Sequence, residues 1–200
     1  MKKPLHLIYV PGILDDIYHI QGLAVKTWWL HGARGHCHVM PWLGEEGYDA
    51  KFQRLLDEIN EYAAQGHSVS LVGASAGASA VLNAFVAQPD KISGVVLICP
   101  KINGPETVSL KTYRRNPAFK DSLEQLQTNL TKLTPRQKAE QVLLYYSPAD
   151  GTIPYEGSAI PGIPEKRLPA IRHGYAIIYG LIFAAAGFIR FLKRLEARNL

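Results

Sequence analysis

Short apolar runs alternate with segments of helical periodicity along most of this 200-residue chain, and no other feature limits the possible fold as strongly. Strands of a parallel sheet are buried on both faces and joined by helical crossovers, so they read as uninterrupted apolar runs between helices. The pattern therefore predicts an α/β fold, a three-layer, doubly wound, mainly parallel sheet of about six strands. The expected strands lie at 5–10, 37–40, 68–72, 95–99, 142–146 and 166–171, and the expected helices at 20–30, 49–65, 74–87 and from 175 onward.

One segment departs from this alternation. Residues 101–140 separate the fourth and fifth predicted strands, which is far longer than a usual connection between such elements. The segment contains amphipathic stretches at 118–130 and 135–140 and no strong strand, so we expect a small helical lid or cap inserted in the fold. Because 200 residues is the size of one domain, residues 1–200 are expected to form a single domain that includes this insertion.

The charge of the chain is basic overall but unevenly distributed. There are 22 Lys and Arg against 17 Asp and Glu, a formal net charge of +5. Residues 101–140 carry +4 and residues 186–200 carry +3, so the remainder is close to neutral. Only the net charge favours nucleic acid, and we exclude that partner. The distribution favours an anionic substrate or surface at the insertion, and leaves open a weak contact of the C-terminal helix with an anionic membrane surface.

The sequence favours a reducing, aqueous compartment. Two cysteines, Cys37 and Cys99, are too few for a disulfide scaffold. The first apolar stretch is short and ends at Pro11, unlike an export signal. The longest apolar stretch, 175–189, falls short of the roughly 20 residues that a membrane-spanning helix needs. We therefore expect a cytoplasmic, soluble protein whose closing helix is buried in the core.

Residues Gly73 to Gly77 read Gly-Ala-Ser-Ala-Gly and join a predicted buried strand to a predicted helix. Small residues allow a sharp turn there, which presents the Ser75 hydroxyl at the carboxyl edge of the sheet. The helix N-terminus behind the serine offers free N–H groups, including that of Ala76, to an oxyanion. Taken alone, the motif also fits a turn that serves only close packing of helix on strand.

An aspartate and a histidine follow the last two predicted strands. Asp150 lies in a turn after the fifth strand, and His173 follows the sixth, just before the closing helix. Singly, each fits a plainer role, as a turn residue or a helix cap. The carboxyl ends of parallel strands meet at one edge, so we expect Ser75, Asp150 and His173 to lie together. Together they supply a nucleophile, a base and a carboxylate that orients the base.

These residues, in the chain order Ser, Asp, His, resemble the α/β-hydrolase family, and the similarity extends over nearly the whole sequence. The chain is similar to the small bacterial esterases and lipases of this family, because the first two antiparallel strands of larger members are absent. The resemblance implies that Ser75 is the nucleophile, His173 the general base and acid, and Asp150 the carboxylate that holds the imidazole tautomer.

The resemblance also implies backbone groups around the serine. The N–H groups of Ile13 and Ala76 would form an oxyanion hole. The sharp turns at the site would depend on Gly12, Gly73 and Gly77.

The chemistry implied by this resemblance is hydrolysis of a carboxylic ester through an acyl-enzyme intermediate, with no metal or organic cofactor. A small-molecule acyl thioester is the closest alternative substrate, since the same three residues serve both reactions. A non-catalytic member of the fold, which binds a ligand or a partner, is the remaining alternative.

Further residues are candidates for lining the substrate pocket. Tyr18 and His19 follow Ile13 closely, and Lys101 comes just after the fourth predicted strand. The chain also has one local cluster of metal-ligand residue types, which matches no closed zinc pattern, so no metal site is expected there: His31, His36, Cys37 and His38.

Overall fold

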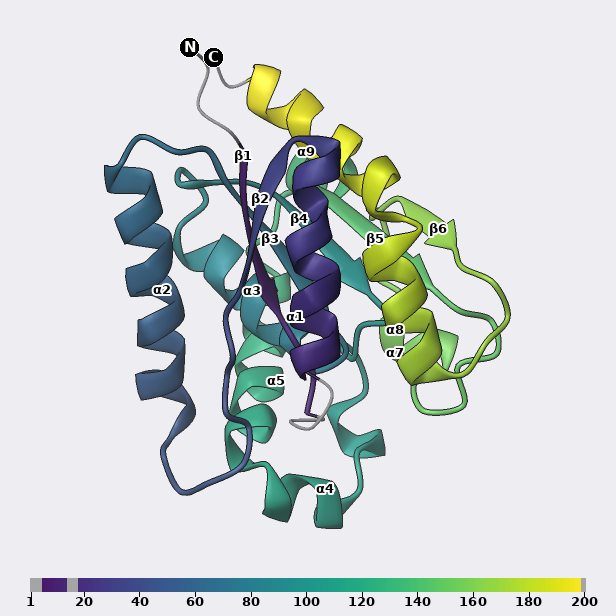
Figure 1. The fold of residues 1–200 in the computed structure, drawn as a ribbon. Coiled ribbons are helices and arrows are strands. Elements are labelled where there is room, and N and C mark those ends of the chain that lie inside the picture. Colours follow the sequence, from purple (N-terminus) through teal and green to yellow (C-terminus); the bar gives the residue numbers. More distant parts are fainter. Residues whose placement is uncertain (1–4, 14–17, 199–200) are drawn as a thin grey trace.

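The computed structural model describes residues 5–13 and 18–198, and within them six parallel strands form one sheet in the order β2-β1-β3-β4-β5-β6. Helices cover both faces of this sheet (Figure 1). The predicted three-layer, doubly wound architecture is therefore confirmed. The strands are β1 (Leu5–Val10), β2 (Ala33–Cys37), β3 (Val69–Ala74), β4 (Ile92–Ile98), β5 (Val142–Tyr146) and β6 (Glu165–Arg167).

The two edge strands differ from the sequence-based expectation. The second strand was expected at 37–40 but occupies Ala33–Cys37, and the sixth was expected at 166–171 but covers only Glu165–Arg167. The residues of β1, β3 and β4 are buried throughout, whereas β2 is only partly buried and β6 is exposed. An edge strand has one unpaired side and need not be apolar, so neither carries the signal that reveals a central strand.

Each face of the sheet has its own hydrophobic core. One core lies between the sheet and α2, α3 and α5, and the other between the sheet and α1, α8 and α9. Figure 1 shows α1, α8 and α9 in front of the sheet and α3 and α5 behind it. The helices of these layers are α1 (Tyr18–Lys26), α2 (Tyr48–Ala64), α3 (Gly77–Ala87), α5 (Pro117–Leu130), α8 (His173–Ile182) and α9 (Ala185–Arg198), and the 3-10 helix η2 (Thr27–His31) continues α1.

The predicted insertion, 101–140, contains the 3-10 helix η3 (Pro105–Thr107) and the helices α4 (Leu110–Arg115), α5 and α6 (Pro135–Gln141). Helix α5 belongs to the core, because its buried side chains pack with α3. The hydroxyls of Ser79 and Ser122 are 2.7 Å apart in that contact, and Asn83 Nδ2 donates to the Ser122 carbonyl oxygen. Helix α4 and the 3-10 helix η3 lie near the carboxyl ends of the strands, because both line a cavity there. That this segment moves as a lid stays a prediction.

The expected closing helix is two helices. Helices α8 and α9 are bent by 59° relative to each other. No described helix is by itself long and apolar enough to span a membrane, while α8 and α9 taken as a bent pair meet the criteria of length and composition. The apolar run gave no sign of this break, because it continues across the bend.

The start of α3 lies directly against the end of β1. A side chain at Gly77 would overlap the carbonyl oxygen of Val10, and one at Gly73 would overlap Val81 and Ala78 of α3. Only hydrogen in place of Cβ allows this approach, so both predicted turn glycines are required where the helix meets the sheet.

Replacing Gly77 with Ala should lower the free energy of unfolding by about 1–3 kcal/mol, because the added methyl group forces β1 and α3 apart. The matched control is Gly22→Ala in α1, where an added Cβ meets nothing within 4 Å. This control should gain about 0.5–1 kcal/mol from helix propensity. Urea denaturation measures both. Equal stabilities of the two variants would contradict the close approach at Gly77.

His6 in β1 has a buried imidazole ring. The residue is 8% exposed, and its ring packs in tilted contacts against Tyr62 and His67, with ring centroids 4.2 Å and 4.3 Å away. Neither of its ring nitrogens has a hydrogen-bond partner in the described part of the chain. Burial, assisted by the nearby His67, Arg34 and His36, lowers the pKa of His6 to about 4 against the opposing effect of Glu58.

This lowered pKa predicts a loss of stability in acid. The unfolded chain binds the proton at about pH 6.5 and the folded chain only near pH 4, so stability is complete above pH 6.5 and falls between these values. The free energy of unfolding should therefore decrease less steeply over this range in His6→Leu than in the wild type. Parallel pH profiles, measured by urea denaturation, would contradict this assignment.

Candidate active site

Ser75 lies in the turn between β3 and α3 with a backbone angle φ of 50°. Residues other than glycine rarely adopt this left-handed backbone conformation. Strained residues of this kind are found most often at functional sites. The turn is held by three backbone bonds: Ser75 N–H donates to Ile98 O, and Ser75 O accepts from the N–H groups of Ala78 and Lys101. The serine is therefore fixed at the carboxyl edge of the sheet.

The loop after β1 passes over this serine. A Cβ atom at Gly12 would lie 2.8 Å from Ser75 Cβ and 3.2 Å from Ser75 Oγ. The third predicted turn glycine thus leaves room for the hydroxyl. Ile13, the next residue, lines the same cavity as Ser75 and Ala76.

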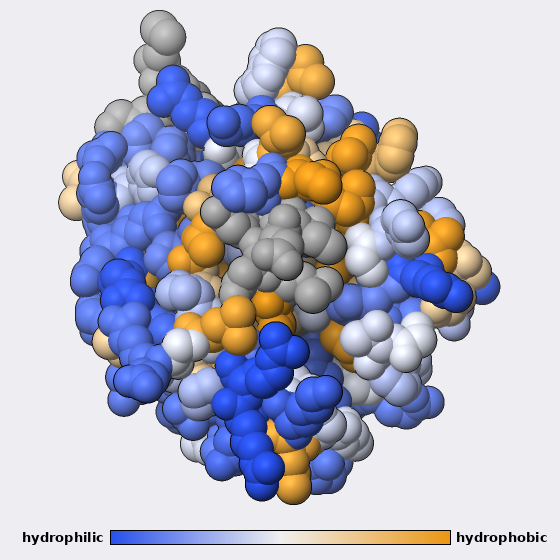
Figure 2. Space-filling view, turned by 60° about the horizontal axis from the view of Figure 1, so that its bottom comes forward, coloured by the Kyte–Doolittle hydropathy of each residue, from blue (hydrophilic) through white to orange (hydrophobic). Residues whose placement is uncertain are grey.

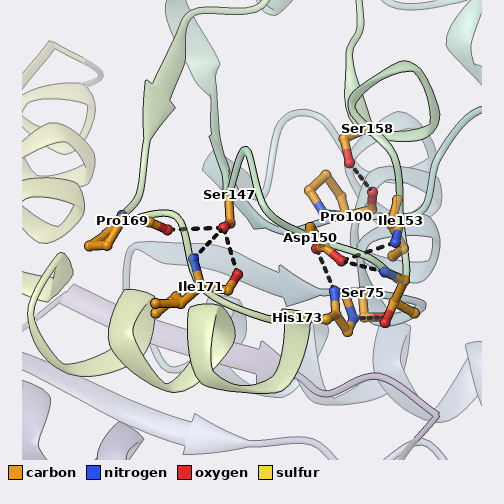
Figure 3. Close-up of polar contacts among 10 residues, drawn as sticks. Ser75, Pro100, Ser147, Asp150, Ile153, Ser158, Pro169, Ile171 and His173 are labelled. Atoms are coloured by element: carbon orange, nitrogen blue, oxygen red, sulfur yellow. Dashed lines mark hydrogen bonds and ion pairs between the residues drawn. The ribbon is translucent and has the colours of Figure 1, made fainter.

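Ser75, His173 and Asp150 form a continuous chain of polar contacts (Figure 3). His173 is the first residue of α8, and its Nε2 lies 3.0 Å from Ser75 Oγ. Its Nδ1 lies 2.6 Å from Asp150 Oδ2, and Asp150 is in the loop after β5. The three residues expected to meet at the strand ends are in direct contact, in an order that lets one imidazole bridge a hydroxyl and a carboxylate.

The environment of Asp150 favours its ionised form. Burial alone would raise the pKa of Asp150, but hydrogen bonds from His173 and from the N–H groups of Ile153 and Thr152 outweigh burial and hold the pKa below its usual value. Both backbone bonds reach Oδ1 at 3.0 Å, which leaves Oδ2 for the imidazole. The carboxylate is thus fixed in position and charge.

A second serine connects β5 to the segment that carries the histidine. Ser147 Oγ lies 2.9 Å from Pro169 O and 2.7 Å from Ile171 O, and accepts a bond from Ile171 N–H (Figure 3). These contacts anchor the chain just before His173 beside the loop of Asp150. Sequence reasoning missed this role, and a hydroxyl bonded across more than twenty residues leaves no local signal.

Cys99 is a further residue at the site that sequence reasoning missed. It follows β4, has a φ of 45° and is buried. One ligand atom from each of Cys99, Asp150 and His173 lies within 4.8 Å of the others, and no other described trio of such residues does so. Burial, followed by the charge of Asp150, raises the pKa of the Cys99 thiol to about 12. The protonated thiol is a poor metal ligand, and the other two groups already bind each other.

A cavity of about 780 Å³ opens beside Ser75. Its walls come from the strand-end loops and from η3 and α4, and Lys101, predicted to line a pocket, lies in it. Figure 2 views the end of the molecule where the strands terminate, and shows several hydrophobic residues around the centre of a mainly hydrophilic surface. The cavity volume is within the usual range for sites that bind small molecules.

His19, another pocket candidate, is not among the described residues that line this cavity. His19 lines a separate cavity of about 410 Å³, together with Cys37 of β2. The side chain of Tyr18 lies outside the described residues. Of the histidine cluster, His36 and His38 both contact Glu58 of α2, at 3.1 Å and 2.6 Å.

The sequence matches no protein-family model, and a comparison with curated proteins also finds no match. Solved structures, in contrast, resemble the chain over almost its full length. The chain is similar to Est1E from Butyrivibrio proteoclasticus at 14% identity, with a TM-score of 0.68 and coverage of 98% of this chain and 90% of that one.

Two further structures give the same result. A monoacylglycerol lipase from Paleococcus ferrophilus is 16% identical, with a TM-score of 0.60 and coverage of 94% and 96%. An S-formylglutathione hydrolase from Agrobacterium tumefaciens is 11% identical, with a TM-score of 0.62 and coverage of 97% and 85%. At these identities the likeness establishes the architecture, and the chain has the α/β-hydrolase fold.

Proposed function

We propose that this protein is a serine hydrolase that cleaves carboxylic esters, with Ser75 as the nucleophile, His173 as the general base and acid, and Asp150 as the orienting carboxylate. The observation that carries the proposal is the contact chain from Ser75 Oγ through both nitrogens of His173 to Asp150, at 3.0 Å and 2.6 Å, beside a cavity. Hydrogen-bond reach between nucleophile, base and orienting group is what nucleophilic catalysis requires.

The geometry accommodates acyl transfer in two steps. In the first, Ser75 Oγ attacks the ester carbonyl while its proton passes to His173 Nε2. The ionised Asp150 keeps the Nδ1 proton in place and stabilises the imidazolium. His173 then protonates the leaving alcohol. In the second step water attacks the acyl-enzyme, with His173 again accepting and returning the proton.

Backbone groups would stabilise the oxyanion that forms in both steps. Ala76 lies at the start of α3, at the positive end of the helix dipole. Ile13 follows Gly12 in the loop after β1 and lines the same cavity as Ser75. We assign the two donors of the oxyanion hole to these N–H groups; removal of one such donor costs about 3 kcal/mol in other hydrolases.

Ester hydrolysis is also supported by two of the similar structures, the monoacylglycerol lipase and the S-formylglutathione hydrolase. The last name keeps a thioester as the alternative substrate. A panel of 4-nitrophenyl esters and matched thioesters of graded chain length separates the two.

Replacing Ser75 with Ala should lower kcat for a short 4-nitrophenyl ester by roughly ten-thousand-fold or more, because no other group can form the acyl-enzyme. The matched control is Ser70→Ala on the same strand β3, whose buried hydroxyl has no hydrogen-bond partner in the described residues. It should keep wild-type kinetics. Steady-state hydrolysis by purified, folded proteins is the measurement, and wild-type activity in Ser75→Ala would identify another nucleophile.

Ser147→Ala should lower kcat by about tenfold to a hundredfold with little change in KM, since the segment before His173 loses its anchor and the imidazole is misplaced. Ser68→Ala is the control, because it removes a hydroxyl contact to Ser93 at the opposite end of the sheet. A loss confined to thermal stability, with kcat unchanged, would show that Ser147 is structural only.

A further inference from the structure

Lys101 places a buried ammonium group in the wall of the cavity beside Ser75. Its backbone N–H donates to Ser75 O, so the residue is attached directly to the turn that carries the serine. Its side chain extends toward η3, where Nζ donates to Gly104 O at 3.0 Å and to Thr107 Oγ1 at 2.8 Å. The residue is 8% exposed, which is unusual for lysine.

This ammonium has no counter-ion in residues 5–13 and 18–198. Both of its acceptors are neutral, and no carboxylate in those ranges lies within the 4 Å of an ion pair. An ammonium carries three N–H bonds, and the two acceptors use two of them. Burial lowers the pKa of Lys101, and the charge of Glu106 opposes that effect. A buried charge without a partner is costly, and a ligand of opposite charge would offset that cost.

Other features of the cavity leave space for such a ligand. Gly157 faces the ammonium, and a Cβ there would lie 3.3 Å from Nζ. Glu106 and Glu156 also line the cavity, but both are exposed to solvent, which screens their charge more than that of the buried lysine. A neutral hydrogen-bond donor would bind the oxygen atoms of Gly104 and Thr107 equally well. These two contacts therefore do not explain why the residue at this position carries a positive charge.

We propose that Lys101 forms an anion subsite, so that the preferred ester carries an anionic group, such as a carboxylate, on the part that occupies this cavity. The proposal rests on the hydrolase function proposed above and specifies its substrate class. The ester carbonyl lies at Ser75, and the anionic group binds the ammonium at the η3 side of the cavity.

The direct test compares two substrates with the same six-carbon diacid chain, the mono-4-nitrophenyl ester of adipic acid and its methyl ester, in which a methyl group removes the negative charge. The wild type should show a kcat/KM about tenfold to a hundredfold higher for the acid, expressed mainly in KM. Lys101→Met should lose this preference and keep most of its activity on the neutral ester. Lys101→Arg should retain part of the preference, because it keeps the charge.

Lys111→Met is the matched control for long-range attraction. Lys111 is an exposed lysine of α4 that does not line the cavity, so its replacement should leave the preference unchanged. If Lys111→Met and Lys101→Met lose the preference for the acid equally, the overall surface charge attracts the substrate. That result would overturn the proposal of an anion subsite. An equal fall on both esters in Lys101→Met would mean that the lysine only holds the η3 loop, which also overturns it.

A binding measurement separates this proposal from the hydrolase function itself. In the Ser75→Ala background, calorimetry with the two adipate esters should give tighter binding of the acid, and Lys101→Met should abolish the difference. This result does not depend on turnover. Equal affinities for both esters in the Ser75→Ala protein would reject the anion subsite even if wild-type hydrolysis is confirmed.

Discussion

The left-handed turn at Ser75 is the constraint on which the rest of the site depends. A non-glycine residue at this φ is strained, and the strain is tolerated because neighbouring segments hold the turn on all sides. Gly77 lets α3 lie against the end of β1, and Gly12 lets the next loop cross the serine without displacing its hydroxyl. Because the turn is fixed by backbone packing, the hydroxyl is held 3.0 Å from His173 Nε2.

Burial determined which parts of the fold the sequence could predict. The central strands are apolar on both faces, so β1 and β5 were predicted with their observed bounds. Strand β2 was predicted a few residues too late, because an edge strand with alternating exposure has no apolar run. The break between α8 and α9 was missed for the opposite reason, since the apolar run continues across it.

The candidate site was predictable where residue type and strand ends coincide, and not where it depends on side-chain direction. Ser75, Asp150 and His173 follow parallel strands, whose carboxyl ends meet at one edge. His19 is close to Ile13 in sequence, yet it lines another cavity. Ser147 contacts the carbonyl oxygens of residues that are more than twenty positions later in the chain. Lys101 was expected near the pocket, but only the structure shows its ammonium to be buried there.

Covalent labelling followed by peptide mapping would show directly whether Ser75 is an activated nucleophile. A fluorophosphonate reacts with a serine that is activated as a nucleophile, and mass spectrometry of the digested protein locates the adduct. We expect one adduct per chain, on Ser75, with a rate of labelling that falls when Asp150 is replaced by Asn. An adduct on a different residue, or no adduct on protein shown to be folded, would contradict the assignment of Ser75, His173 and Asp150 as a catalytic unit.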